Sequence, residues 1–328
     1  RSLSSLVKPT TATILARNCC SASMSCPTIR VPEFKELKKN CTRLRILDAA
    51  FTAATPPIAH EDFMRNHYGK VEEMAQKWTN NDYIAEHIPG AVYFNHEVAT
   101  FPGKYEKYEL YPAEIFQRYV QSLGINKDDE VVVYGRGMAA GMLFAARAWW
   151  LLKVYGMENV RVLEGGFEKW KKEGGEVTAE VPTPKPGNWT ACAPQQHLVV
   201  SFDELFGGAC GADVINLLDS RPAAQFNGTE PLAVPANGAT GAHIFGAKNV
   251  PLPTLLTPEG ELKDADGIRK ALSTCGYDPA KRSVTMCNAG GQAAMLGLAM
   301  TKAGLPFRLF NGSLRETALR APERISEK

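Results

Sequence analysis

One cysteine, Cys287, stands between an apolar stretch and a run of small residues, in the sequence SVTMCNAGGQAAMLGLAM. The residues before it, 284–286, are typical of the end of a buried strand, and residues 293–302 repeat apolar side chains at helical spacing. The cysteine therefore opens a loop that joins a strand to a helix. Backbone N–H groups and the positive end of the helix can converge on one point of such a loop. This arrangement favours a thiolate, so the pattern predicts a nucleophilic cysteine.

The loop residues themselves support this interpretation, because they are small or flexible and would let their N–H groups hold an anionic sulfur or an oxyanion. They are Asn288, Ala289, Gly290, Gly291, Gln292 and Ala293. The competing interpretation is that Cys287 is a small buried hydrophobic residue, which is the common role of a cysteine. The eight cysteines and six histidines show no CxxC pair and no metal-ligand spacing. We therefore predict free thiols and no metal.

The chain contains two copies of one unit, because four motifs recur in the same order in both halves. RLRILDAAF resembles DVINLLDSR, EHIPGAVYF resembles AHIFGAKNV, and NVRVLEGGFEKW is echoed by PFRLFNGSLRET. The fourth pair aligns VVVYGRG with VTMCNAG, and this places Gly135 where Cys287 stands in the second copy. The first copy therefore has the same scaffold without the nucleophile.

Short apolar strands alternate with amphipathic helical stretches in each copy, which predicts an α/β fold with a mostly parallel sheet and helices on both faces of it. Ligands of such sheets bind at the carboxyl ends of the strands, where Cys287 is expected. Arg147, Trp149 and Trp150 share one helical stretch and are expected to fill the first core or the interface between the copies. The predicted segments are a leader or extension (1–29), a first domain (30–175), a Pro-rich linker (176–196) and a second domain (197–320).

Composition excludes several classes of protein. A chain of 328 residues with 45% hydrophobic and 22% charged residues has room for two ordinary domains. No apolar run is long enough to span a membrane, and a net charge of +2 gives no reason to expect a nucleic-acid partner. The first 26 residues are basic, rich in Ser and Thr and free of acidic residues, as in a mitochondrial transit peptide, although a disordered extension has the same composition. Met24 as an internal start would give a cytoplasmic form, so the expected location is mitochondrial or cytoplasmic.

The order of HIPGA, AARAWWLLKVYG, VLEGGFEKW, PKPGNWTA and LLDSR resembles the tandem-domain rhodanese family, and most of all its 3-mercaptopyruvate sulfurtransferase branch. The resemblance covers about residues 33–320. It implies two rhodanese-like domains, of which the first is non-catalytic and the second carries the catalytic Cys287. It also implies that this thiolate takes a sulfane sulfur from 3-mercaptopyruvate or thiosulfate as a persulfide and passes it to a thiol or to cyanide. Thioredoxin or a low-molecular-weight thiol is the implied acceptor, and no cofactor is implied.

Several substrate-binding positions of the family differ in this chain. Two arginines normally hold the carboxylate of the donor; the first matches Arg221, whereas Gln225 occupies the second position and lacks the bidentate guanidinium fork. The branch also has an auxiliary Asp-His-Ser proton relay. Its positions align with Glu97, Tyr108 and Ala289, so only the carboxylate is kept. These differences favour an alternative, a rhodanese-fold binding or regulatory protein with weakened catalysis.

A third interpretation is a cysteine phosphatase, since some phosphatases share this fold. Their loop closes on an arginine six residues after the cysteine, and this position is Ala293 here. Without that guanidinium the charge of a phosphoryl transition state has no clamp, so this interpretation is disfavoured.

Overall fold

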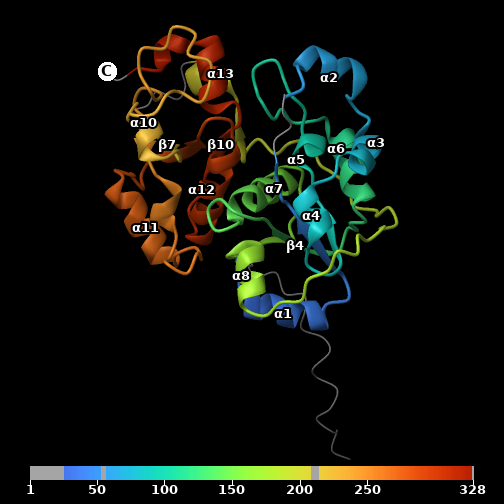
Figure 1. Cartoon of the computed structure of the whole chain (residues 1–328). Coiled ribbons are helices and arrows are strands. Elements are labelled where there is room, and N and C mark those ends of the chain that lie inside the picture. Colours follow the sequence, from blue (N-terminus) through green and yellow to red (C-terminus); the bar gives the residue numbers. More distant parts are fainter. Residues whose placement is uncertain (1–25, 53–56, 208–213, 327–328) are drawn as a thin grey trace, which may run out of the picture.

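The computed structural model describes residues 26–52, 57–207 and 214–326. Two five-stranded sheets, all of whose strand pairs are parallel, occupy the two halves of the chain, with helices packed around them (Figure 1). The α/β fold predicted from the sequence is therefore confirmed. Most of the predicted leader, residues 1–25, lies outside the described residues.

The sheet of the first half has the strand order β1-β5-β4-β2-β3. Strand β4 is buried along residues 131–134, which explains its run of apolar and β-branched side chains. Strand β1 begins two residues before residue 30, the predicted start of the first domain. It is nevertheless part of this sheet, since it pairs with β5 at the edge. The strands are β1 (Thr28–Ile29), β2 (Leu44–Asp48), β3 (Ala91–Tyr93), β4 (Glu130–Tyr134) and β5 (Val160–Leu163).

The sheet of the second half has the order β6-β10-β9-β7-β8, which is the same topology element by element. Its strands are β6 (Val199–Val200), β7 (Ile215–Asp219), β8 (Lys248–Asn249), β9 (Arg282–Met286) and β10 (Arg308–Phe310). Strand β4 ends one residue before Gly135, and β9 ends one residue before Cys287. The carbonyl of Gly135 accepts the N–H of Phe167 at 3.0 Å, and the carbonyl of Cys287 accepts that of Leu314 at 3.0 Å. The sequence alignment of Gly135 with Cys287 is therefore confirmed.

Helices connect the strands and cover both sheets. Those of the first half are α1 (Val31–Asn40), α2 (His60–Asn66), α3 (Val71–Lys77), α4 (Asn81–Ala85), α5 (His96–Ala99), α6 (Ala113–Ser122), α7 (Met142–Val154) and α8 (Gly166–Lys172). Those of the second half are α9 (Phe202–Phe206), α10 (Ala223–Phe226), the 3-10 helix η1 (Leu252–Leu255), α11 (Ala265–Thr274), α12 (Gly291–Lys302), α13 (Ser313–Arg320) and the 3-10 helix η2 (Pro322–Arg324).

Helices α7 and α12 pack against each other between the two sheets, in the middle of Figure 1. Both helices are apolar on nearly all sides, because each packs on its own sheet and on the other helix. One cluster of buried side chains consequently runs through both halves. Arg147, Trp149 and Trp150 of α7 are all buried there, as expected.

The loop before α7 is longer than the sequence pattern indicates. The apolar stretch predicts a helix that includes Met138, but α7 begins only at Met142. Ala139 and Ala140 have φ values of 51° and 53°, so the chain turns through left-handed conformations before the helix starts. In the second half, α12 starts at Gly291, close behind Cys287. The second loop is therefore the tighter of the two.

The Pro-rich segment between the halves is ordered along the first half. Gly187, Trp189 and Cys192 donate their backbone N–H groups to carbonyls of that half at 2.8, 3.2 and 2.9 Å. The ring of Trp189 is 4% exposed. The segment is therefore held by hydrogen bonds and by burial of an aromatic ring, as an ordered connection.

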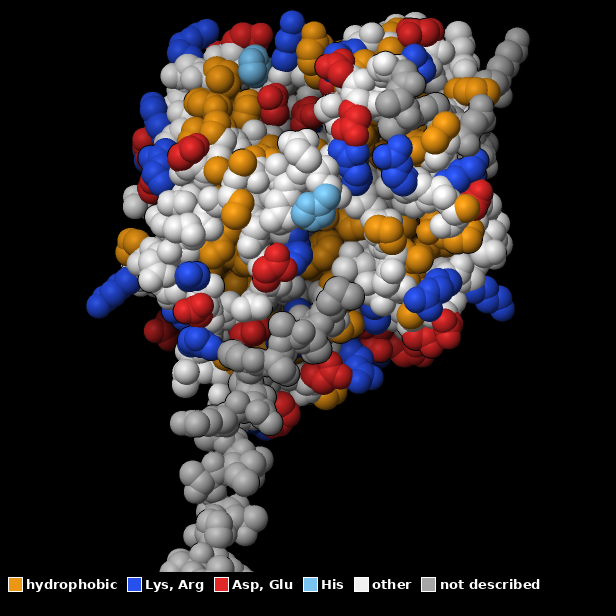
Figure 2. Space-filling view, turned by 180° about the vertical axis from the view of Figure 1, so that it is seen from behind, with side chains coloured by type: hydrophobic (Ala, Val, Ile, Leu, Met, Phe, Trp, Pro, Cys, Tyr) orange, Lys and Arg blue, Asp and Glu red, His pale blue; other side chains and the backbone are white. Residues whose placement is uncertain are grey.

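The surface carries both signs of charge. On the face seen in Figure 2, lysine and arginine side chains alternate with aspartate and glutamate, and apolar side chains form patches between them. Neither sign covers a continuous area of this face, in keeping with the small net charge. Among the described residues, no helix has both the length and the apolar character needed to cross a membrane.

The packing of α12 on the residue just before β10 generates a stability prediction. Gly297 lies in the middle of α12, and a Cβ atom there would lie 2.2 Å from Cε2 of Phe307. Alanine in place of glycine normally stabilises a helix by about 0.5–1 kcal/mol. Here we expect Gly297→Ala to lower the free energy of unfolding by about 1–3 kcal/mol, because the core is overpacked. Urea denaturation measures the change.

Phe307→Ala supplies the matched background for this test. With the ring removed, Gly297→Ala should raise the free energy of unfolding by about 0.5–1 kcal/mol, as helix propensity alone predicts. A destabilisation of equal size in both backgrounds would show that the phenylalanine ring is not the cause.

Candidate active site

Cys287 follows the last residue of β9 at the carboxyl edge of the second sheet and is 2% exposed. The backbone N–H of Gly290 donates a hydrogen bond to its Sγ atom over 3.1 Å. Gly290 caps α12 with φ at 85°, a left-handed conformation that glycine adopts without strain. The turn thus directs an amide and the positive end of a 12-residue helix toward the sulfur. These features stabilise negative charge on a sulfur atom.

The backbone of Cys287 is fixed by Ser313, which sequence reasoning missed. The N–H of Cys287 donates to Oγ of Ser313 over 3.2 Å, and this hydroxyl donates to the carbonyl of Phe310 over 2.7 Å. Ser313 is fully buried with φ at 50°, whereas the first half has Gly166 there with φ at 56°. A serine in a conformation suited to glycine indicates that the hydroxyl is needed. The sequence did offer a signal for this serine: the first copy has Gly-Gly at residues 165–166, whereas the second copy has Gly-Ser at residues 312–313.

The first half contributes a cation, Arg147 of α7, to the loop. The Arg147 side chain is buried, with 3% of the residue exposed. Its Nη2 donates to Oδ1 of Asn311 over 2.8 Å, and its Nη1 has no hydrogen-bond partner among the described residues. A Cβ atom on Gly290 would lie 3.0 Å from that Nη1, so the guanidinium packs directly on the turn that holds the sulfur. Burial lowers the pKa of Arg147 to about 10, and the nearby Cys287 sulfur opposes this shift. Arg147 therefore remains cationic at neutral pH.

Asn311 connects the two halves beside this cation. Its Nδ2 donates to the carbonyl of Tyr108 over 2.8 Å and also to the carboxyl of Glu106. Burial raises the pKa of Glu106 to about 7, while the hydrogen bond from Asn311 opposes that shift. One amide side chain thus orients Arg147 and anchors residues 106–108 of the first half.

The other loop positions predicted from the sequence come together as expected. Nδ2 of Asn288 donates to Oε1 of Gln225 over 3.0 Å, which links the loop to α10. The remaining members lie around the first turn of α12: Ala289, Gly291 and Gln292 are partly exposed, and Ala293 is buried. The side chains of these loop positions are themselves neutral.

Arg221 is buried where β7 ends. The sequence predicted that it would hold the donor, but its side chain is 0% exposed and forms a two-pronged ion pair with Asp219, with Nη2–Oδ2 at 2.7 Å. It also donates to the carbonyl of Ala242 over 2.8 Å. The physical reason is that Asp219 is buried two residues away and needs a counter-charge. Arg221 therefore stabilises the strand end through Nε and Nη2, while its Nη1 has no hydrogen-bond partner among the described residues.

Of the three positions aligned with a proton relay, two lie together. Glu97 and Tyr108 line one mainly apolar pocket of about 60 Å³ in the first half. Burial raises the pKa of Tyr108 to about 12, with additional effects of Glu97 and the Cys287 sulfur. Ala289 has no hydroxyl to offer. Tyr108 is therefore a neutral phenol near the sulfur, and a relay through position 289 cannot form.

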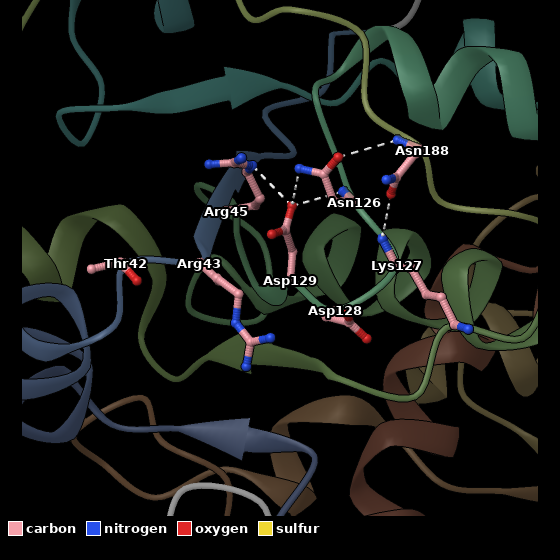
Figure 3. A pocket seen from close by; sticks show the side chains of 8 residues that line it. All are labelled: Thr42, Arg43, Arg45, Asn126, Lys127, Asp128, Asp129 and Asn188. Atoms are coloured by element: carbon pink, nitrogen blue, oxygen red, sulfur yellow. Dashed lines mark hydrogen bonds and ion pairs between the residues drawn. The ribbon is translucent and has the colours of Figure 1, made fainter. Parts of the chain in front are cut away.

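A second pocket can be set aside. It measures about 430 Å³, lies where β2 and β4 begin, and holds an Arg45–Asp129 pair supported by Asn126 (Figure 3). This is the edge of the sheet opposite the carboxyl ends, and its lining includes no cysteine. The five cysteines in the described parts of the chain are unpaired. Within those parts, no group of three or more His, Cys, Asp and Glu side chains is placed to hold a metal ion.

Comparison with known proteins assigns the family. Residues 75–173 match the model of the rhodanese-like domain. A Caenorhabditis elegans protein whose name places it among thiosulfate sulfurtransferases is 37% identical over 297 residues, which cover 87% of this chain and 90% of the relative. The 3-mercaptopyruvate sulfurtransferase of Escherichia coli is 32% identical over 244 residues, covering 73% of this chain and 83% of that enzyme.

The fold agrees with these relatives. The crystal structure of the Tum1 protein from Saccharomyces cerevisiae superposes with a TM-score of 0.71 at 24% identity, over 92% of this chain and 97% of that one. The match extends over both sheets and the connection between them. The chain therefore belongs to the tandem-domain rhodanese family of sulfurtransferases.

Proposed function

We propose that Cys287 carries the transferred sulfur as a persulfide, and that the donor is 3-mercaptopyruvate or thiosulfate. The observation that supports this most directly is the N–H of Gly290 placed 3.1 Å from Sγ of Cys287 at the start of α12. The amide, the helix end and the cation of Arg147 all favour an anionic sulfur. Two sulfurtransferase relatives, named for thiosulfate and for 3-mercaptopyruvate, supply the two donor classes.

The proposed reaction has two displacements. The Cys287 thiolate attacks the donor sulfur, a sulfur–sulfur bond forms, and the donor's bond to that sulfur breaks. From 3-mercaptopyruvate the electron pair leaves on carbon as an enolate, which takes a proton to become pyruvate; from thiosulfate the pair leaves with sulfite. An acceptor thiolate or cyanide then attacks the outer sulfur, and the Cys287 thiolate is released.

Arg147 of the first half packs on the turn beside the sulfur, whereas Gln225, at the second position expected to hold the donor, is neutral. In this proposal Arg147 is the group that meets the donor's negative charge. A single guanidinium favours a donor with one negative charge over a dianion. Since Cys287 is only 2% exposed, the donor reaches it when neighbouring side chains move.

The remaining assignments follow from this one. We propose that residues 197–320 form the catalytic domain, that 30–175 form a domain without a nucleophile, and that 176–196 connect them. Low-molecular-weight thiols or thioredoxin are the proposed acceptors. A mitochondrial or cytoplasmic location stays a prediction, because the segment on which it rests lies in residues 1–25, outside the described part of the chain.

Sulfur loading of Cys287 tests the proposal. We expect incubation with 3-mercaptopyruvate or thiosulfate to add the mass of one sulfur atom to the peptide containing Cys287, because its thiolate is the nucleophile. Cys287→Ser should abolish this gain, as measured by mass spectrometry. Cys275→Ser is the matched control in the same domain; burial raises the pKa of the Cys275 thiol, and loading should persist in this variant.

The alternative, a binding or regulatory protein of this fold, makes a different prediction. It expects binding of the donor without a mass gain on Cys287 and without thiocyanate production from cyanide. That pair of results would contradict the proposed transfer.

The role of Arg147 is tested by removing its charge. We expect Arg147→Gln to slow persulfide formation on Cys287 roughly tenfold, the effect of about 1.4 kcal/mol of lost charge stabilisation. Rapid-quench mass spectrometry measures the rate. Lys153→Gln removes a cation from the last turn of the same helix, where Lys153 bonds Glu158 over 2.8 Å, and should leave the rate unchanged. A wild-type rate in folded Arg147→Gln would refute the assignment.

A further inference from the structure

His96 is a buried histidine whose polar atoms are not satisfied. Its side chain is 3% exposed, and neither ring nitrogen makes a hydrogen bond of ordinary geometry among the described residues, while the backbone of Phe144 lies near enough to favour the protonated ring. Aromatic rings surround it: the centroids of Phe51, Phe94 and Phe144 lie 5.8, 5.3 and 5.5 Å away. A buried polar group without a partner destabilises the folded protein and calls for an explanation.

The position of His96 is held firmly. It is the first residue of α5, whose cap Asn95 accepts the N–H of Glu97 over 2.8 Å. The hydroxyl of Thr100 donates to the carbonyl of His96 over 2.7 Å. Because the backbone is fixed on both sides, the ring is directed by the fold rather than left in place by a loose loop.

The ring lines a small cavity next to the active-site loop, together with Arg147 and Gly291. Gly291 is the first residue of α12, immediately after the turn that holds the sulfur. Two unsatisfied polar groups therefore share one cavity: the imidazole of His96 and Nη1 of Arg147. The space is about 10 Å³, which admits at most one water molecule. Tyr108 and Thr100 line both this cavity and the neighbouring pocket of about 60 Å³, so movement of Tyr108 would join the two.

The two groups differ in charge. Burial, reinforced by the positive charge of Arg147, lowers the pKa of His96 to about 3, so the imidazole is neutral at physiological pH. A neutral imidazole has one N–H donor and one acceptor. A cationic donor beside a neutral donor matches a ligand with a carboxylate next to an uncharged carbonyl. That combination is an α-keto acid; thiosulfate lacks the neutral carbonyl.

We infer that His96 is a specificity-determining residue, which donates a hydrogen bond to the keto oxygen of an α-keto acid while Arg147 pairs with the carboxylate. This inference rests on the proposed function, since it says which residues bind the keto and carboxylate groups of the donor, the groups that do not carry the transferred sulfur. It requires the side chains around the cavity, Tyr108 first among them, to move when the ligand enters.

Pyruvate, the organic product of the proposed reaction, tests the inference without turnover. Binding of pyruvate and of acetate, which lacks the keto group, is measured by NMR titration in Cys287→Ser and in the same variant carrying a change at His96. We expect His96→Leu to weaken pyruvate binding roughly tenfold and to leave acetate binding unchanged, because one hydrogen bond is lost. His96→Gln restores an N–H donor and should return pyruvate affinity to within about threefold of the parent.

Stability separates this role from a structural one. His87 is the matched control: it is a buried histidine of the same half, and its ring nitrogens lie 2.7 and 3.0 Å from the carbonyls of Tyr83 and Glu180. His87→Leu should lower the midpoint of thermal unfolding and leave pyruvate affinity unchanged. His96→Leu should keep or raise the midpoint, since it removes unsatisfied polar atoms.

Three results would overturn the inference: equal weakening of pyruvate and acetate, unchanged pyruvate binding in His96→Leu, or no pyruvate binding by the parent protein. Unchanged binding would mean that the cavity holds only a water molecule. The failure of the proposed function looks different, because it is the absence of a sulfur adduct on Cys287 with every donor. A keto-acid preference that depends on His96 would stand even then.

Discussion

The contact between Arg147 and Gly290 is the constraint on which the rest of the site depends. A left-handed glycine turn directs its N–H at Cys287, and the space beside that glycine is filled by a guanidinium from the other half. No side chain fits at position 290 without displacing Arg147 or Asn311. The packing of α7 on α12 sets this distance, so a cation of the first half lies directly beside the loop that holds Cys287.

Each half has a buried aspartate at the end of an equivalent strand, and the two halves neutralise its charge with arginines at different positions. In the first half Asp48 pairs with Arg136, the residue directly after Gly135, at 2.7 Å. In the second half the partner of the equivalent aspartate is Arg221 at the end of its own strand. The position after Cys287 is consequently free to be the neutral Asn288. The loop after Cys287 therefore needs no arginine to neutralise Asp219, because Arg221 already does so.

Local patterns predicted much of the fold and the centre of the site. Strand and helix periodicity located the loop at Cys287, and duplication identified Gly135 as its counterpart, because both signals lie within short stretches. The ion pair of Arg221 was not predicted, because sequence spacing does not show whether a nearby buried carboxylate captures a guanidinium. Ser313 and His96 were missed for a related reason: their roles come from which atoms remain unpaired after packing. The apolar sequence of α7 predicts that this helix is buried. It does not predict that Arg147 is the side chain of α7 that contacts the loop after Cys287.

A sealed sulfur and unsatisfied polar groups around it are physically connected. Cys287 is 2% exposed, while His96 and Nη1 of Arg147 lie buried beside its loop with no hydrogen-bond partner in the part of the chain that the structure describes. Each such group destabilises the closed arrangement by about 1–3 kcal/mol, and water or a ligand relieves that penalty when the cavity opens. The difference in free energy between closed and open forms is thereby reduced. Incomplete hydrogen bonding beside the Cys287 loop therefore lowers the free-energy cost of moving the side chains around this cavity, which is the movement that a ligand needs.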